Sequence, residues 1–235
     1  MYKSLVIIGN GPSMCGFDFS ILNNHTTVGM NAAYRYWKRI NWYPTYYCCL
    51  DIQVINTHHK NIKALLDDNL VKKIFIRAHF FNYYPDLKND PRILIFENLK
   101  NNSLFFKSSN PNTITTGGTV CRFGMYLGYN KLYLIGIDCK YTEIIPEAKK
   151  ISNIKLQIVK TPIFNPNYFF DDYQQVGDIY HIPNPHGNIH LNIFKILRND
   201  IKKYKMCIEV INCNKKSALY EQQIFPYQEL ESILN

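Results

Sequence analysis

Residues 4–13 read SLVIIGNGPS. After its first residue the run 4–8 is continuously apolar, which is typical of a strand in a parallel sheet whose two faces are both covered by helices. The glycine-bearing turn 9–13 follows at once. Glycine lets backbones approach closely, and free N–H groups beside a serine hydroxyl can hold a phosphate or a sugar ring. We therefore predict a buried first strand, followed by a turn that either binds a ligand or simply connects the strand to a helix.

Apolar runs alternate with helical periodicities along the rest of the chain. Further strands are predicted at 27–30, 46–50, 71–76, 93–96, 131–137 and 206–211. Helices are predicted at 32–39, 53–66, 116–127, 191–204 and 228–234, and a polar loop at 98–113. This alternation predicts an α/β fold, a Rossmann-like and mostly parallel sheet with helices on both faces.

One segment breaks the alternation. The length of 235 residues suits a single domain spanning 1–235, but residues 139–190 hold five of the eleven prolines and the aromatic-acidic cluster NPNYFFDDYQQ. Long irregular stretches inside compact domains are usually functional. We expect residues 139–190 to form an irregular insertion over the site, and we call this segment the lid.

Composition limits the classes of function. Hydrophobic residues make up 46% and charged residues 19%, so a packed core is expected and global disorder is excluded. The net charge of +9 favours an anionic partner, such as a phosphorylated small molecule or an anionic membrane surface. Because no run reaches five like charges, a nucleic-acid partner is not predicted.

The seven cysteines form no C-x-x-C pair, and buried free thiols in a reducing compartment are expected. No stretch approaches the ~20 apolar residues of a membrane span. We expect a cytoplasmic protein. Peripheral contact with the inner membrane and assembly into a homo-oligomer both stay open.

Polar residues follow the predicted strands one after another, and the carboxyl ends of parallel strands are where such sheets bind ligands. A second turn, ITTGGT at 114–119, opens a helix whose N-terminus could attract an anion. Its alternative interpretation is tight packing of the helix on a strand. The candidate nucleotide-binding residues are Asn10, Gly11, Ser13, Asn31, Asp51, Thr115, Thr116, Gly117 and Asp138.

Three histidines lie together in YHIPNPHGNIH, where the lid returns to a helix. A neutral imidazole near a helix N-terminus can act as a general base, although each of the three could equally be a satisfied structural residue. The chain contains no D-x-D motif, the usual carboxylate clamp for a divalent cation. No metal site and no cofactor are therefore predicted.

The two turns together resemble a known family. VIIGNGPS and ITTGGTVCRFGMYLGYNKLYLIGID, at 6–13 and 114–138, resemble the bacterial sialyltransferases of glycosyltransferase family 42. That family lies in a wider group with flagellin-modifying motility-associated glycosyltransferases and archaeal hydroxymethylpterin pyrophosphokinase. The resemblance implies an inverting, metal-independent enzyme that transfers a sialic acid-like nonulosonic acid from a CMP donor. It also implies a surface glycan acceptor, such as lipopolysaccharide, lipooligosaccharide or capsule.

The resemblance also implies roles for residues. The turn at 9–13 would line the donor site, Asn31 would contact the nucleotide, and the turn at 114–119 would meet the cytidine and the phosphate. The base would be His190 or else His186, and the lid tyrosines Tyr168, Tyr173 and Tyr180 would hydrogen-bond the leaving phosphate. The chain departs from the family in Asp51, where asparagine is usual, in the doubled glycine 117–118 and in the lid sequence.

Two other functions stay open. A hydroxymethylpterin-type pyrophosphokinase would need ATP and Mg²⁺, and a carboxylate cluster at Asp51 and Asp138 would favour it. A non-catalytic nucleotide-sugar-binding protein of a polysaccharide locus would lack a histidine within reach of the sugar. A CMP leaving group gains little extra charge, so N–H groups, a helix dipole and tyrosines could stabilise it without a metal.

Overall fold

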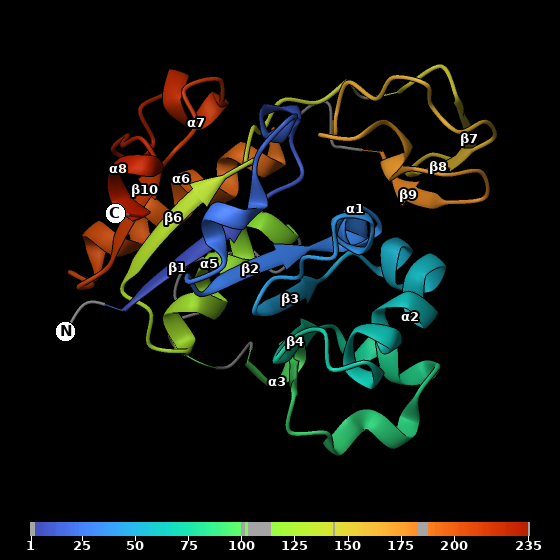
Figure 1. The fold of residues 1–235 in the computed structure, drawn as a ribbon, viewed down its shortest axis with the longest axis horizontal. Coiled ribbons are helices and arrows are strands. Elements are labelled where there is room, and N and C mark those ends of the chain that lie inside the picture. Colours follow the sequence, from blue (N-terminus) through green and yellow to red (C-terminus); the bar gives the residue numbers. More distant parts are fainter. Residues whose placement is uncertain (1–2, 100–101, 103–113, 143, 183–187, 235) are drawn as a thin grey trace.

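A seven-stranded sheet forms the centre of the molecule (Figure 1). The computed structural model describes residues 3–99, 102, 114–142, 144–182 and 188–234. The strands lie in the order β10-β6-β1-β2-β3-β4-β5, and every neighbouring pair is parallel. The predicted α/β fold with a parallel sheet is therefore confirmed.

The observed strands lie close to the predicted ones. The first two have the predicted bounds, whereas the last strand begins three residues later than predicted. The loop predicted at 98–113 lies mostly outside the described residues. The strands are β1 Ser4–Ile8, β2 Thr27–Met30, β3 Tyr46–Cys49, β4 Lys73–Ile76, β5 Ile93–Ile95, β6 Lys131–Ile135 and β10 Glu209–Asn212.

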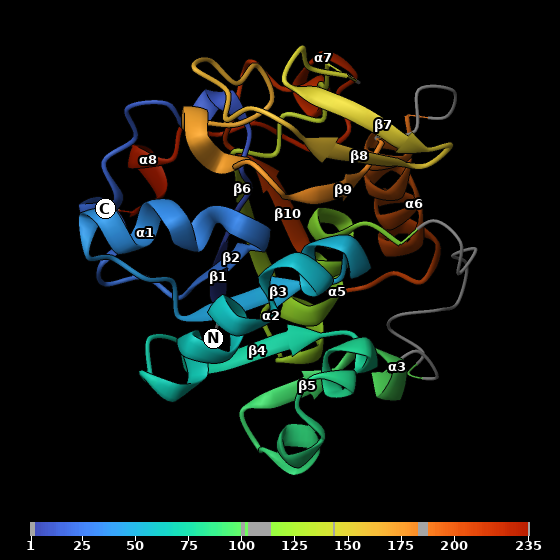
Figure 2. The same cartoon turned by 90° about the vertical axis from the view of Figure 1, so that its right-hand side faces the viewer.

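Helices cover both faces of the sheet (Figure 2). Three of these helices have an N-cap residue whose side chain accepts a hydrogen bond from an amide of the first turn. The N-cap residues are Asp51, Thr115 and Ser217. No helix in the described ranges is long and apolar enough to cross a membrane. The helices are α1 Tyr34–Ile40, α2 Ile52–Asp67, α3 Phe96–Leu99, α5 Thr116–Tyr126, α6 Ile189–Lys203, α7 Ala218–Glu221 and α8 Glu231–Leu234.

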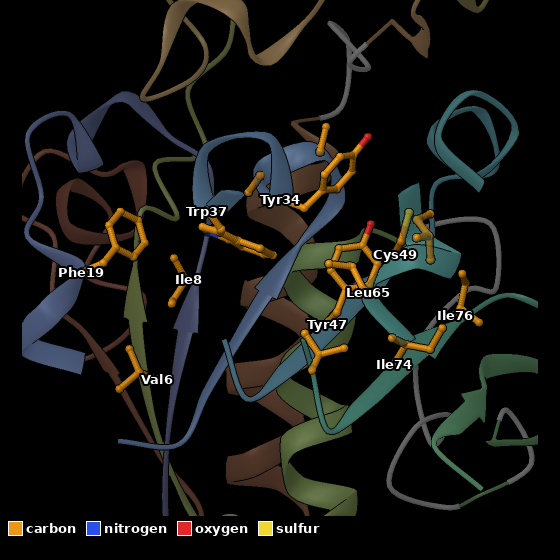
Figure 3. Close-up of a cluster of buried hydrophobic side chains, with 14 of the residues drawn as sticks. Val6, Ile8, Phe19, Tyr34, Trp37, Tyr47, Cys49, Leu65, Ile74 and Ile76 are labelled. Carbon is orange, nitrogen blue, oxygen red and sulfur yellow. The ribbon is translucent and has the colours of Figure 1, made fainter. Parts of the chain in front are cut away.

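Strand β1 shows why its apolar run is continuous. Leu5 and Ile7 join the core on the side of α5 and α6, while Val6 and Ile8 join the core on the side of α1 and α2. Figure 3 shows the second core, in which Trp37 of α1 lies above the sheet. The side chains on both faces of the strand are buried, so the sequence does not alternate between apolar and polar residues.

The lid is not irregular throughout, and that part of the prediction is wrong. Strands β7 Ala148–Ser152, β8 Lys155–Ile158 and β9 Ile179–His181 form a small antiparallel sheet. In Figure 1 this sheet lies at the upper right, apart from the main sheet and beyond α1. Strand β7 is exposed along most of its length, so no apolar periodicity marked it in the sequence.

All seven cysteines are free. Four are buried, as predicted, in the two cores or beside them: Cys48, Cys49, Cys121 and Cys139. The prediction is wrong for the other three, because Cys15 and Cys207 are exposed and Cys213 is half-buried.

Candidate active site

A cavity of about 540 Å³ opens at the carboxyl ends of the central strands, between the sheet and the lid. Its size lies within the range of small-molecule sites. Ser13 is not among its lining residues, and His186 lies outside the described residues. The structure brings the other predicted residues together in its lining: Asn10, Gly11, Asn31, Asp51, Thr115, Thr116, Gly117, Asp138, Tyr168, Tyr173, Tyr180 and His190.

The first glycine turn has a structural role that the sequence did not reveal. The Gly9 amide donates to Ile135 O at 2.8 Å and the Gly11 amide donates to Gly136 O at 2.9 Å. A Cβ on Gly9 would lie 2.2 Å from Gly136 O, so only glycine fits. These two amides therefore join the ends of β1 and β6 and are not free for a phosphate.

Asp138 lines the cavity beside this turn and connects the turn to the C-terminal tail through hydrogen bonds. Its carboxylate accepts hydrogen bonds from the Ser13 amide at 2.9 Å, the Ser13 hydroxyl at 2.5 Å and Asn214 Nδ2 at 2.7 Å. The predicted ligand role of Ser13 is thus replaced by a contact within the protein. Asn214 was missed because it lies in the C-terminal tail, far away in the sequence.

We expect Gly11→Ala to destabilise the protein, because the new Cβ would lie 2.4 Å from Asp138 Cγ. The cost of such overpacking is about 1–3 kcal/mol of the free energy of unfolding. Gly117→Ala is the matched control, because its Cβ would meet nothing closer than 3.7 Å and alanine favours helix. Chemical denaturation measures both, and equal losses in the two variants would contradict the packing argument.

Two buried oxygens in the cavity lack hydrogen-bond partners among the described residues: Asn10 Oδ1 and Asn31 Oδ1. The orientation of the Asn10 amide is fixed, because its Nδ2 donates to Met30 O at 3.2 Å and to the Tyr173 hydroxyl at 3.0 Å. An unsatisfied buried acceptor costs about 1–3 kcal/mol. Hydrogen-bond donors on a bound ligand would therefore satisfy both oxygens.

The second turn supplies a helix N-terminus to the same cavity. Thr115 Oγ1 caps α5 by accepting from the Gly118 amide at 3.2 Å, and Thr116 Oγ1 accepts from the Leu50 amide at 3.2 Å. The first-turn amides and the positive end of the helix dipole favour an anion here. The two adjacent glycines have different roles. Gly117 lines the cavity, whereas Gly118 allows close packing against α6, because a Cβ there would lie 2.3 Å from Ile193.

Asp51 links the lid to the sheet. It caps α2 by accepting from the Gln53 amide at 2.8 Å, and it pairs with His181 Nδ1 of β9 at 3.0 Å. Burial opposes ionisation of Asp51, but the hydrogen bonds from His181 and the α2 amides lower its pKa below 3.8. The same hydrogen bond raises the pKa of His181 above 6.5.

We expect this link to weaken as the pH rises through the raised pKa of His181. The contribution of that histidine to stability is complete below its unfolded pKa and is lost above its folded pKa. The contribution of Asp51 is lost only in acid, as the pH falls through its lowered pKa. Hydrogen exchange of β9 amides should therefore rise, beyond the intrinsic rate, as the pH is raised above about 6.5 and through the raised pKa of His181.

Strand β4 serves as the internal control for that measurement. In His181→Gln the protection of β9 should no longer depend on pH. Unchanged protection of β9 in the wild-type protein over the same range would show that the pair does not hold the lid.

His190 lies in the first turn of α6 and lines the cavity, with its ring centroid 4.6 Å from that of Tyr141. Burial lowers the pKa of His190 to about 4, so the imidazole is neutral at pH 7. The sequence predicted a neutral imidazole near a helix N-terminus. Loss of hydration is the dominant cause of the lowered pKa.

The three lid tyrosines also line the cavity. Tyr168 and Tyr173 stack with centroids 3.7 Å apart, and the Tyr173 hydroxyl accepts hydrogen bonds from Asn10 Nδ2 and the Ala32 amide. Burial raises the pKa of Tyr180 to about 12 and those of the other two further. All three hydroxyls therefore stay protonated at neutral pH and can donate.

A buried network that the sequence did not predict holds the lid from the other side. Arg35 makes two hydrogen bonds to Asp178, at 2.6 and 3.0 Å, and another to Tyr173 O at 2.6 Å. His58, hydrogen-bonded to Tyr34 at 2.6 Å, adds a contact of 3.7 Å to Asp178. Among the described residues, no group of three His, Cys, Asp or Glu side chains could hold a metal ion.

Solved structures share this architecture. The sialyltransferase CstII from Campylobacter jejuni, in complex with the substrate analogue CMP-3FNeuAc, matches with a TM-score of 0.55 and 21% identity over 97% of this chain and 86% of that chain. CST-II in complex with a trisaccharide acceptor and CMP matches with a TM-score of 0.53 and 21% identity, over 93% and 84%. The chain has a glycosyltransferase fold.

A second glycosyltransferase shares the fold. The MAf glycosyltransferase from Magnetospirillum magneticum AMB-1 matches with a TM-score of 0.53 and 16% identity over 99% of this chain. This chain corresponds to only 34% of that protein. No protein-family model and no curated protein matches the sequence.

Proposed function

We propose that this protein is an inverting glycosyltransferase of the family 42 type, which transfers a sialic acid-like nonulosonic acid from a CMP donor to a glycan. The observation that carries the proposal is a cavity that contains a helix N-terminus and two side-chain oxygens without hydrogen-bond partners among the described residues. The shared fold with enzymes solved with CMP or a CMP-sugar analogue supports it.

A CMP-sugar offers the groups that the cavity requires. Its ribose hydroxyls and cytosine amine are hydrogen-bond donors, which suit Asn10 Oδ1 and Asn31 Oδ1. Its single phosphate is an anion, which suits the N-terminus of α5 beside Thr116 and Gly117. The protonated hydroxyls of the lid tyrosines can donate to the phosphate oxygens as the negative charge leaves with CMP.

We assign the proton transfer to His190. Its neutral imidazole accepts the proton of an acceptor hydroxyl, while that oxygen forms a bond to the anomeric carbon. The bond from the anomeric carbon to the phosphate oxygen breaks, and CMP departs with the electron pair. A single displacement of this kind inverts the anomeric configuration. His186 is the second candidate for the base.

The proposed reaction uses no metal. A CMP leaving group carries one phosphate, whose charge N–H groups and hydroxyls can neutralise. Asp51 and Asp138 are held by separate sets of protein donors, on α2 and β9 and in the 9–13 turn and C-terminal tail. They therefore do not offer the free carboxylate cluster that would favour a pyrophosphokinase.

Release of CMP from CMP-sialic acid, measured with EDTA and with Mg²⁺, tests the proposal. We expect hydrolysis of the donor in the absence of acceptor, at a rate that EDTA leaves unchanged. Loss of CMP release in EDTA, restored by Mg²⁺, would contradict the metal-independent mechanism. Tight CMP binding without any release or transfer would indicate a non-catalytic binding protein.

A further inference from the structure

One lid histidine of the cavity is paired with a carboxylate. His181 of β9 lines the cavity, and its Nδ1 lies 3.0 Å from Oδ1 of Asp51, which lines the cavity too. Within the described ranges this is the one hydrogen bond of the His181 ring. Because the pairing uses Nδ1, a protonated ring keeps its Nε2–H group for a second acceptor.

This pair lies beside the N-terminus of α5. Asp51 follows Leu50, and the Leu50 amide donates to Oγ1 of Thr116, the first residue of α5, at 3.2 Å. Thr116 lines the same cavity. Asp51 and His181 are therefore close to the helix end to which the proposed function assigns the phosphate of the CMP-sugar.

A second helix balances part of the negative charge of Asp51. The carboxylate accepts hydrogen bonds from the Gln53 and Val54 amides in the first turn of α2, at 2.8 and 3.4 Å. These amides lie at the positive end of the α2 dipole. The carboxylate therefore does not fully cancel the positive charge of a proton on His181.

Other charged groups around His181 are positive. Lys155 lies opposite His181 in the pairing of β8 with β9, and Arg77 follows β4. The hydrogen bond to Asp51 raises the pKa of His181 above 6.5, although burial and the charges of Lys155 and Arg77 oppose the rise. Without a carboxylate at position 51, these opposing effects would favour the neutral ring.

His181 differs in this respect from the other histidines that line the cavity. Burial lowers the pKa of His58 of α2 and that of His190 to about 4, so both rings are neutral at pH 7. Among the described cavity histidines, His181 is thus the one that can hold a proton near neutral pH.

We propose that the pair of Asp51 and His181 places a charged hydrogen-bond donor, the Nε2–H of His181, on the phosphate of the bound CMP-sugar. The inference rests on the proposed function. Negative charge grows on the phosphate as its bond to the anomeric carbon breaks, so a cationic donor stabilises the transition state more than the bound substrate. His181 keeps its proton while CMP departs with the electron pair. Asp51 is a positioning residue that acts through His181.

Binding of the methyl ester of CMP, compared with that of cytidine, tests this contact without turnover. The ester is a phosphodiester like the CMP-sugar and keeps one negative charge while the histidine titrates, whereas cytidine has no phosphate. By isothermal titration, the affinity for the ester should fall as the pH rises through the raised pKa of His181, because the ring loses its proton there. The affinity for cytidine should not change over the same range.

Two variants separate the charge from the fold. At pH 6.5, where the raised pKa leaves most of His181 protonated, His181→Gln should weaken binding of the ester about 10-fold or more and leave cytidine binding unchanged. Asp51→Asn keeps a good N-cap for α2 and removes only the charge. Its loss should shrink as the pH is lowered, because His181 then gains a proton without the carboxylate. The loss in His181→Gln should not shrink.

Asp172→Asn is the matched control. Asp172 is a second lid carboxylate that pairs with a cation of the main sheet domain, Arg39 of α1, but neither side chain lines the cavity. This variant should bind the ester and cytidine like the wild type at every pH. A general loosening of the lid would weaken binding in the control as well.

Three outcomes would overturn the inference: wild-type affinity for the ester that does not depend on pH, equal losses of ester and cytidine binding in His181→Gln, or an equal loss in the control. Each leaves a cytidine site in place, so the proposed function survives it. A wild-type protein that binds neither cytidine nor the ester would instead contradict the proposed function, and this inference with it.

Discussion

Replacing His190 by alanine lowers turnover at least ~100-fold while affinity for CMP stays within about threefold, because a positioned base contributes roughly 10²- to 10⁴-fold. The ring lines the cavity at the first turn of α6, and burial keeps it neutral. Since burial lowers its pKa to about 4, the acid limb of the kcat/KM profile should lie well below pH 6.5. Turnover assays and CMP titration measure the two effects separately.

His25→Ala is the control for that result, because His25 is not among the cavity-lining residues. Near-wild-type turnover in His190→Ala together with a large loss in His186→Ala would show that the ranking of the two histidines is wrong. If neither substitution matters, the histidine mechanism itself is wrong.

Thr116→Leu should abolish CMP binding while the fold survives. Thr116 stands at the N-terminus of α5 inside the cavity, and its Oγ1 accepts from the Leu50 amide. Leucine would fill the space proposed for the nucleotide and leave that amide without its partner. Calorimetry should detect no CMP binding, while the far-ultraviolet circular dichroism stays that of the wild type.

Thr116→Val separates bulk from hydrogen bonding. It keeps the shape of threonine and loses only the Leu50 hydrogen bond, and because that buried amide then lacks a partner the cost is about 1–3 kcal/mol in stability. Its CMP affinity should therefore stay measurable. A leucine variant that binds CMP as tightly as wild type would exclude this part of the cavity as the nucleotide site.

The sequence predicted a helix or strand most accurately where the burial of its side chains fits only one kind of secondary structure. Strand β1 has both faces buried, so its apolar run marks it without ambiguity. The lid sheet was missed because β7 is mostly exposed and rich in lysine, so burial leaves no pattern there. Only pairing with β8 makes β7 a strand.

The positions of the strand ends in the sequence predicted where the site lies. They did not predict the hydrogen bonds within the site. Asn31 and Asp51 could be predicted because parallel strands deliver their carboxyl ends to one edge. The hydrogen bond between Arg35 and Asp178 joins residues 143 positions apart, and nothing local in either segment signals it. For the same reason the amides of Gly9 and Gly11 were assigned to a ligand, whereas their acceptors lie at the end of β6.

Isothermal titration of the intact protein with CMP, UDP and ATP tests most directly whether the cavity is a site for a cytidine nucleotide. Each titration is run with and without Mg²⁺. We expect CMP to bind at least ~10-fold more tightly than UDP or ATP, because its single phosphate meets the α5 N-terminus without a metal cation. Binding of UDP or ATP tenfold more tightly than CMP would contradict it.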